Sequence, residues 1–233
     1  MNYPNQYLDH CLEGSSSVFK GLNQKDRETI AQHHSIAVVN RGGFLFREGE
    51  KTRGLICLIS GKVKIFKEGV GEREQILRMI KPGDIIGYRI LFSENTWPVS
   101  AKAIENSIIC ILEKRTIIRI IKKNADLGFS LLRIVSEELS HSYERTVSLT
   151  QKHVRGRVAE SLLILSDTYG FEQEEKTIAV SLSREEVANL SSMTPSNAIR
   201  TLSNFAKERI IRIKGRKITI LDMDSLVQIS EIA

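Results

Sequence analysis

Residues 183–208 read SREEVANLSSMTPSNAIRTLSNFAKE, and this stretch decides the fold of the C-terminal part of the chain. Ser183, with Glu186 three positions later, is a capping-box pattern, in which each side chain bonds the backbone N–H of the other residue. The pattern predicts the start of a helix. We expect this first helix to run to Leu190 and to be followed by a short turn.

Thr194 and Pro195 predict the start of a second helix. Thr caps helix starts, and Pro in the first helical position loses only an N–H that would lack a partner there. We expect the helix to run to about Glu208, so that the whole segment is a helix-turn-helix. The residues expected to supply its apolar side are Ala198, Ile199, Leu202, Phe205 and Ala206.

The beginning of the second helix carries polar side chains suited to reading DNA. A recognition helix offers its N-terminal part to base edges in the major groove. Arg can bind guanine through two hydrogen bonds, and Asn can bind adenine in the same way. Unpaired N–H groups at helix starts can also hold phosphates. The residues expected to contact DNA from this segment are Ser183, Arg184, Thr194, Ser196, Asn197 and Arg200.

A basic hairpin is predicted after the helix-turn-helix. Two strand-like runs, 210–213 and 217–221, are joined at Gly215, which favours a tight turn. From Arg200 to Lys217 there are seven basic residues and one acidic residue, a concentration that a phosphate-binding surface requires. Such a hairpin would act as a wing and touch the DNA backbone through Lys214, Arg216 and Lys217.

Two other interpretations of this region stay open. The charges could form a solvated face, and winged helices also serve as protein-interaction modules. Arg200 and the basic wing together favour DNA over both.

The N-terminal half has a different texture, made of short β-branched or alternating runs punctuated by glycines. Many short strands with regular turns predict an antiparallel barrel or sandwich, and the missing strand–helix alternation argues against a doubly wound nucleotide fold. The predicted strands are 36–39, 43–46, 55–59, 63–66, 75–80 and 108–112.

A long helix without proline is predicted at 125–153. Eight positions step by alternating four and three residues, as in a coiled-coil seam, and we expect the helix to pair with that of a second copy. A helix packed on its own domain is the alternative. A polar interruption in the seam could set the register or face a ligand. The seam positions are Gly128, Leu132, Val135, Leu139, Ser142, Thr146, Leu149 and His153.

The bulk composition is that of an ordinary globular protein of 233 residues with net charge +6. No apolar run is long enough to span a bilayer, and no secretory signal is visible, so we expect a cytoplasmic protein without membrane contact. Three scattered cysteines argue against a disulfide framework. We expect Cys57 and Cys110 to be buried and Cys11 to be exposed.

This layout resembles the Crp/Fnr family of transcription regulators over about residues 18–225. The resemblance implies an α+β chain: an N-terminal antiparallel β-roll of the cyclic-nucleotide-binding (jelly-roll) type at 1–124, a dimerisation helix at 125–153, and a winged helix-turn-helix at 154–233. It further implies a homodimer on a palindromic double-stranded DNA operator, with RNA polymerase as a partner. The resemblance rests on LFREG (45–49), LISGKV (58–63), KPGDIIG (81–87), GRVAESLL (156–163), LSREEVA (182–188) and IKGRKI (213–218).

The effector pocket departs from the pattern of cyclic-AMP-binding members. Where that pattern has Gly-Glu-Leu and Arg-Ser-Ala, this chain has Gly87-Tyr88-Arg89 and Val99-Ser100-Ala101. Without the arginine a cyclic phosphate is poorly compensated, so we expect no tight cyclic AMP binding. Arg89 could substitute in a rearranged site, which keeps a true cyclic-nucleotide receptor as the alternative. The candidate effector-pocket residues are Gly87, Tyr88, Arg89, Val99, Ser100, Ser142 and Tyr143, the last two by alignment with the polar pair of the dimer helix.

Other family chemistries are not expected. Four thiolates for an iron–sulfur cluster cannot come from three cysteines, and the five histidines are more readily structural than haem ligands. We expect no cofactor, no metal, no catalytic residues and an unknown effector. In the reading helix, Ser196 stands where the family has Glu, and Arg200 is retained, so we expect altered operator specificity with a guanine contact preserved.

Overall fold

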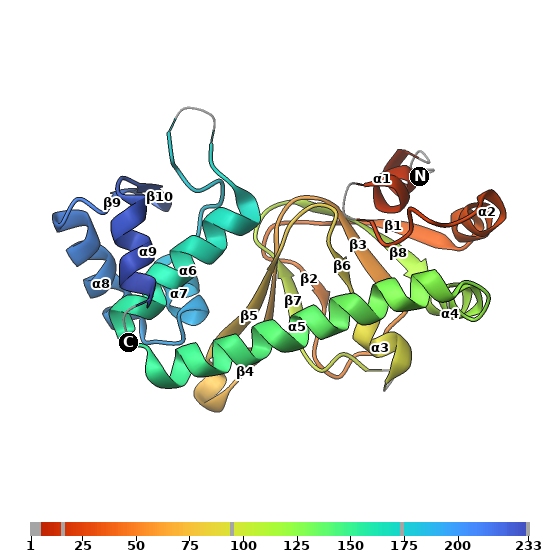
Figure 1. Ribbon diagram of the computed structural model, residues 1–233, viewed down its shortest axis with the longest axis horizontal. Coiled ribbons are helices and arrows are strands. Elements are labelled where there is room, and N and C mark those ends of the chain that lie inside the picture. Colours follow the sequence, from red (N-terminus) through yellow and green to blue (C-terminus); the bar gives the residue numbers. More distant parts are fainter. Residues whose placement is uncertain (1–5, 15–16, 94–95, 173–174, 232–233) are drawn as a thin grey trace. The chain divides into compact units, whose positions relative to one another are not determined.

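The computed structural model describes residues 6–14, 17–93, 96–172 and 175–231. The chain forms two compact units, one made of Met1–Lys67 and Ile80–His141, the other of Glu68–Met79 and Ser142–Ala233. Each unit has its own arrangement of elements (Figure 1). Among the described residues, no helix has the length and apolar character needed to cross a membrane.

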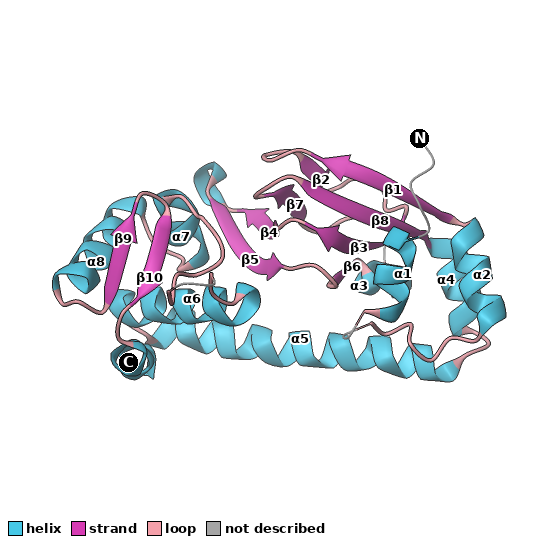
Figure 2. Cartoon of the chain, turned by 90° about the horizontal axis from the view of Figure 1, so that it is seen from above, coloured by secondary structure: helices cyan, strands magenta, loops and turns pink. Residues whose placement is uncertain are grey.

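The strands of the β-roll form two four-stranded sheets, in the orders β1-β8-β3-β6 and β2-β7-β4-β5 (Figure 2). The six predicted strands are confirmed, and the short β6 and β7 are additional because a two-residue strand and the run Ser-Ala-Lys-Ala carry little β-type pattern. The strands are β1 His34–Val39, β2 Phe44–Phe46, β3 Gly54–Ser60, β4 Val63–Glu68, β5 Glu74–Ile80, β6 Ile85–Ile86, β7 Ser100–Ala103 and β8 Ser107–Glu113, with the 3-10 turn η1 Val70–Glu72 between β4 and β5.

Helices cover the outer face of the first sheet. Side chains alternate along β3 and β8, so one set fills the space between the two sheets while the other packs against helices. These helices are α1 Gln6–Glu13, α2 Gln24–Gln32, α3 Tyr88–Phe92 and α4 Lys114–Ile121.

The expectation that Cys11 is exposed is wrong, since only 2% of it is accessible. It lies on α1 and packs in the same apolar cluster as Cys57 and Cys110, which face each other in the β3–β8 register. Hydrogen bonding with the thiols of Cys110 and Cys57, together with burial, raises the pKa of Cys11. All three cysteines are free and buried, and they act as packing groups in this cluster.

The predicted long helix is α5, Ala125–Gln151. Leu132 and Leu139 are exposed as a seam requires, but the apolar stripe then continues through Tyr143 and Val147, which are 65% and 50% exposed, rather than through Ser142 and Thr146. A straight helix has 3.6 residues per turn, so its apolar side drifts from a strict 3.5-residue repeat.

The second unit contains the predicted helix-turn-helix and hairpin, with α9 as an additional helix packed on α6. Gly170 ends α6 with a positive φ of 69°, as a glycine at a helix end allows. The fold is thus α+β as predicted. The elements are α6 Val154–Tyr169, α7 Arg184–Leu190, α8 Pro195–Lys207, β9 Ile211–Lys214, β10 Lys217–Ile220 and α9 Met223–Glu231.

Candidate nucleic-acid interface

The starts of α7 and α8 are capped as the sequence predicts. The Ser183 hydroxyl accepts from the Glu186 N–H at 3.1 Å, and the Glu186 carboxylate accepts from the Ser183 N–H at 2.8 Å. The Thr194 hydroxyl accepts from the Asn197 N–H at 3.4 Å. Both hydroxyls are therefore used within the protein, and a phosphate at either helix start would meet the remaining N–H groups.

Helix α8 separates a buried face from an open one. Ala198, Leu202 and Phe205 are buried, whereas Ser196 and Arg200 are exposed on the face predicted to meet base edges. Ile199, assigned from the sequence to the apolar side, is instead 48% exposed. It follows Ala198 directly, and two consecutive helical residues point about 100° apart, so both cannot face the core fully. An apolar side chain in this place is suited to the methyl group of thymine.

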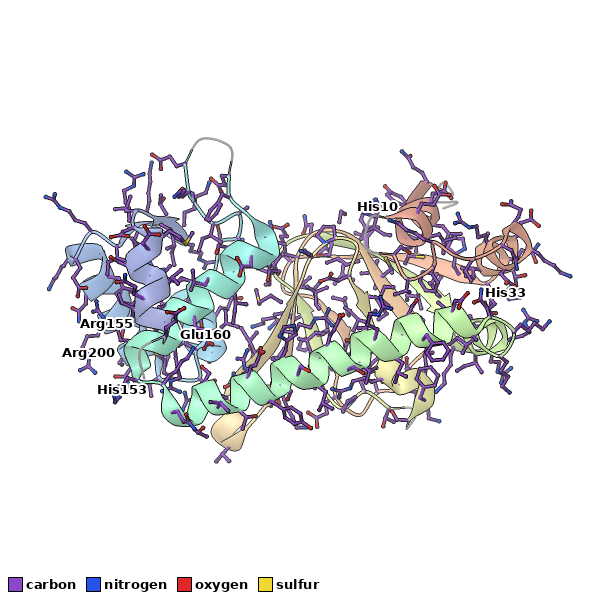
Figure 3. All side chains as sticks on the ribbon, viewed as in Figure 1. His10, His33, His153, Arg155, Glu160 and Arg200 are labelled. Atoms are coloured by element: carbon purple, nitrogen blue, oxygen red, sulfur yellow. The ribbon has the colours of Figure 1, made fainter. Side chains whose placement is uncertain are left out.

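Arg200 has a partner within the helix. Its Nη2 donates to Asn197 Oδ1 at 3.0 Å, which restrains the guanidinium on the exposed face. The Arg200 side chain points outward from the second unit (Figure 3). The same bond occupies the amide oxygen that Asn197 would need to accept from adenine. The geometry therefore makes Asn197 a support for Arg200 in the free protein rather than an independent reader of adenine.

The wing contributes fewer free charges than the sequence count indicates. Lys217 Nζ lies 2.8 Å from a carboxylate oxygen of Glu172, and Arg212 pairs with Glu175. Lys214 and Arg216 flank the turn, are exposed, and have no ionic partner within the described part of the chain. Among the described residues, these two are therefore the cations of the hairpin that are left without an ion pair.

Arg184 occupies a position different from that expected. Its Nη2 donates to the Gly215 carbonyl at the wing turn, at 2.8 Å. Its Nη1 is buried and has no hydrogen-bond partner among the described residues. The guanidinium thus joins the start of α7 to the wing, and it is not a free phosphate ligand in this structure.

An ion pair anchors the far end of α8. Arg155 and Glu208 form a two-pronged pair, with Nη1 2.8 Å from Oε1, and the guanidinium lies 4.7 Å from the centre of the Phe205 ring. The hydrogen bonds from Arg155 lower the pKa of Glu208 and raise that of Arg155. The pair fixes α8 against α6, so the recognition helix is held at both ends.

The candidate effector residues are not gathered around one cavity. Tyr88 is buried, but it packs in the cluster beneath α1 rather than between the two sheets. The Ser100 hydroxyl accepts from the Glu48 N–H at 3.0 Å. Val99 is half-buried and Arg89 exposed, while Ser142 and Tyr143 are exposed on α5.

An aromatic pair packs between the two sheets. Trp97, 4% exposed, stacks on Phe46 with ring centres 3.5 Å apart. A Cβ atom placed on Gly87 would lie 2.8 Å from the Trp97 ring, so glycine and a φ of 97° suit this position. The sequence reasoning missed Trp97, although it is the only tryptophan and lies two residues before Val99.

Two cavities lie in the first unit. One of about 510 Å³ opens beside Phe46 and Trp97, and none of the candidate effector residues lines it. The other, of about 760 Å³, includes Arg89 among apolar neighbours such as Leu132. Within the described residues, no set of three histidine, cysteine or acidic side chains is placed to hold a metal ion.

Two family models match the chain in the order of its two parts. A cyclic nucleotide-binding domain matches residues 37–124, and a Crp-like helix-turn-helix domain matches residues 156–229. A β-roll of the first kind followed by a winged helix of the second defines a class of DNA-binding transcription regulators. The chain belongs to the Crp/Fnr family.

Known relatives and solved structures agree with this assignment. A CRP-like cAMP-activated global transcriptional regulator of Mycobacterium tuberculosis is 27% identical, covering 95% of this chain and 99% of the relative. The fumarate and nitrate reduction regulatory protein of Vibrio cholerae is 26% identical, covering 96% and 91%. The structure of FixK2 from Bradyrhizobium japonicum shares the fold, with a TM-score of 0.77 at 20% identity, covering 86% of this chain and 98% of that one.

Proposed function

We propose that this DNA-binding regulator acts as a homodimer that reads a palindromic operator through α8 and is controlled by something other than cyclic AMP. The observation that carries the DNA-reading part is Arg200, exposed on the open face of a helix that is capped at its start and anchored at its end. A guanidinium held in this way is prepared for two hydrogen bonds to guanine.

The dimer is supported by the apolar stripe on α5. Leu132, Leu139, Tyr143 and Val147 are each at least half exposed, and such a stripe is stabilised by pairing with its own copy around a two-fold axis. The two recognition helices of a dimer would then meet half-sites about one helical turn apart. Operation in the cytoplasm, contact with RNA polymerase and the lack of a catalytic role are parts of the same proposal.

Cyclic AMP is disfavoured by the chemistry at two positions. Val99 stands where a phosphate-binding arginine is needed, and Trp97 packs between the sheets against Phe46. A cyclic phosphate beside this pair would lack the charge-assisted bonds that an arginine at position 99 provides. The M. tuberculosis relative is cAMP-activated by name, and at 27% identity the two chains need not share an effector. We therefore propose an unidentified effector.

Two measurements test the proposal. Duplexes selected from random sequence by the full-length protein, at stated salt, should share a palindrome containing guanine, and Arg200→Ala should lose about tenfold or more of the specific affinity. Lys207→Ala, an exposed cation at the end of the same helix, is the matched control and should lose much less. An Arg200→Ala protein that binds every duplex with the same affinity as the wild type would contradict the assignment and favour a protein-docking module.

Thermal unfolding with cyclic AMP or cyclic GMP tests the effector part. We expect no rise in melting temperature with either nucleotide, whereas a ligand that binds the folded state stabilises it by RT ln(1 + [L]/Kd), where [L] is its free concentration and Kd its dissociation constant. A clear rise that grows with nucleotide concentration would restore the alternative of a cyclic-nucleotide receptor with a rearranged site.

A further inference from the structure

The turn between α7 and α8 is held by side chains from distant parts of the sequence. Gln75 Nε2 donates to the Asn189 carbonyl at 2.9 Å, and Arg73 Nη2 donates to the Met193 carbonyl at 3.0 Å. Carbonyls at the end of a helix lack partners in the helix, and buried ones need another donor. The end of α7 and the turn after it receive these donors from Arg73, just before β5, and from Gln75, within β5; these residues, here called the β4–β5 segment, lie over 110 positions earlier in the chain.

Arg145 on α5 connects this segment with the turn. Its Nη2 donates to both the Ile76 carbonyl, at 2.7 Å, and the Leu190 carbonyl, at 2.8 Å. Burial lowers the pKa of Arg145, whereas the charge of Glu160 acts in the opposite direction. One guanidinium thus bonds two backbones at once, and hydrogen bonds from a charged donor in a partly buried place are strong.

These hydrogen bonds matter because the turn has an unfavourable backbone conformation. Ser192 has a positive φ of 55°, which is costly for a residue with a side chain and persists only when its surroundings impose it. A further arginine, Arg157, donates to the Ser192 carbonyl at 3.0 Å. Because α8 begins at Pro195, the backbone angles of this turn determine the direction of the recognition helix.

The chain links this arrangement to the β-roll. Glu68–Met79 belongs by its contacts to the second unit, yet Lys67 and Ile80 at its two ends belong to the first.

We propose that Arg73, Gln75 and Arg145 form a polar clamp that positions α8 for base reading. These are positioning residues, which act through the turn at Asn189 to Met193 and not through contact with DNA. The inference rests on the proposed reading of DNA by α8, and it adds the residues that hold that helix in place.

The test uses two variants of the full-length protein that remove donors from opposite sides of the turn. Arg145→Met removes the bridging guanidinium, and the double variant Arg73→Met/Gln75→Leu removes the donors of the β4–β5 segment. Arg133→Met, an exposed arginine on α5, is the matched control. For each protein, affinity for the selected operator and for a random duplex is measured over a range of salt concentrations, and amide hydrogen exchange is followed at residues 189–193.

The clamp predicts a loss of specificity without a loss of phosphate contacts. The ratio of specific to non-specific affinity should fall about tenfold for Arg145→Met and about fivefold for the double variant. The slope of affinity against salt concentration should stay as in the wild type, because that slope counts phosphate contacts. Exchange at 189–193 should accelerate in both variants, and Arg145→Lys should restore part of the ratio.

Other outcomes would overturn the clamp. An unchanged ratio with unchanged exchange in the double variant excludes it, and this variant decides the matter if Arg145→Met fails to fold. A salt slope reduced by about one in the double variant would mean that Arg73 binds a phosphate directly. Hydrogen exchange needs no DNA: if the wild type does not discriminate among duplexes, the proposed function fails while exchange still decides whether the clamp holds the turn.

Discussion

The open face of α8 and the interior of the β-roll differ in what they present: the first exposes polar side chains, and the second buries aromatic ones. On α8, polar side chains lie exposed on a helix whose caps are complete, and Arg200 is restrained by Asn197. Between the sheets of the roll, Trp97 and Phe46 are stacked and buried. A polar group acts on a ligand only where its surroundings leave it accessible. Both regions therefore have the fold of the family. Only α8 presents accessible polar side chains that suit an anionic partner such as DNA.

The largest expected effect is on stability and concerns the interior of the β-roll. Trp97→Ala removes the partner of Phe46 and should destabilise the protein by about 3–5 kcal/mol, the usual cost of deleting a large buried aromatic side chain. Denaturant unfolding measures this loss. Trp97→Phe, which keeps a ring in the stack, should cost clearly less. Equal, small losses for both would mean that the interior is not held by this pair.

The next effect concerns the open region. Arg200→Lys keeps the charge but loses the planar fork, so affinity for the operator should fall by about 1–3 kcal/mol while affinity for random duplex stays nearly unchanged. Competition binding at fixed salt measures both values. A parallel fall on both duplexes would assign Arg200 to the DNA backbone instead of to a base.

The capping box is expected to matter for stability at an intermediate level. Ser183→Ala removes the acceptor of the Glu186 N–H and should cost about 1 kcal/mol in the free energy of unfolding. Ser203→Ala, an exposed serine within α8, serves as control and should have little effect. A loss of DNA affinity much greater than the loss of stability would show that the hydroxyl binds phosphate as well.

A smaller effect is expected from the support of Arg200. Asn197→Ala frees the guanidinium, and the preference for guanine at the contacted position should weaken by about 0.5–1.5 kcal/mol, the worth of one ordinary hydrogen bond. Binding to operators with single substitutions measures it. If the loss falls instead on an adenine position, Asn197 reads that base itself.

The smallest effect is a dependence of stability on pH. The pKa of Glu208 is lowered by Arg155, so the pair contributes stability that is fully present above the ordinary pKa of Glu and is lost as the pH falls through the lowered value. Unfolding of Glu208→Gln at several pH values should lack this acidic loss. The pair is exposed, and high salt should reduce the difference.

Local patterns predicted local structure well. The caps at Ser183 and Thr194 depend on neighbours a few residues away, and the structure has both of them. Helix α4 escaped prediction because its run of isoleucines is as typical of a strand as of a helix. Helix α1 is too short for its periodicity to stand out.

The facing of individual side chains could not be predicted in the same way. Cys11 is buried because α1 covers a sheet formed much later in the chain. Lys217 is paired because Glu172 is brought to the hairpin by tertiary structure. Tyr88 packs toward the helices, and Trp97 packs between the two sheets. The spacing of the neighbouring residues does not predict which side of the sheet either side chain faces.

The hydrogen bond from Arg184 to the carbonyl of Gly215 has a consequence for operator geometry. It ties the start of the helix-turn-helix to the tip of the wing, so the two cannot slide independently along a duplex. In the proposed complex, α8 meets bases while Lys214 and Arg216 meet phosphates, and the distance between these two sets of contacts is then set by the protein. A duplex whose geometry does not match this distance must bend to make both sets of contacts. The stiffness of the base-pair steps that flank each half-site then contributes to specificity.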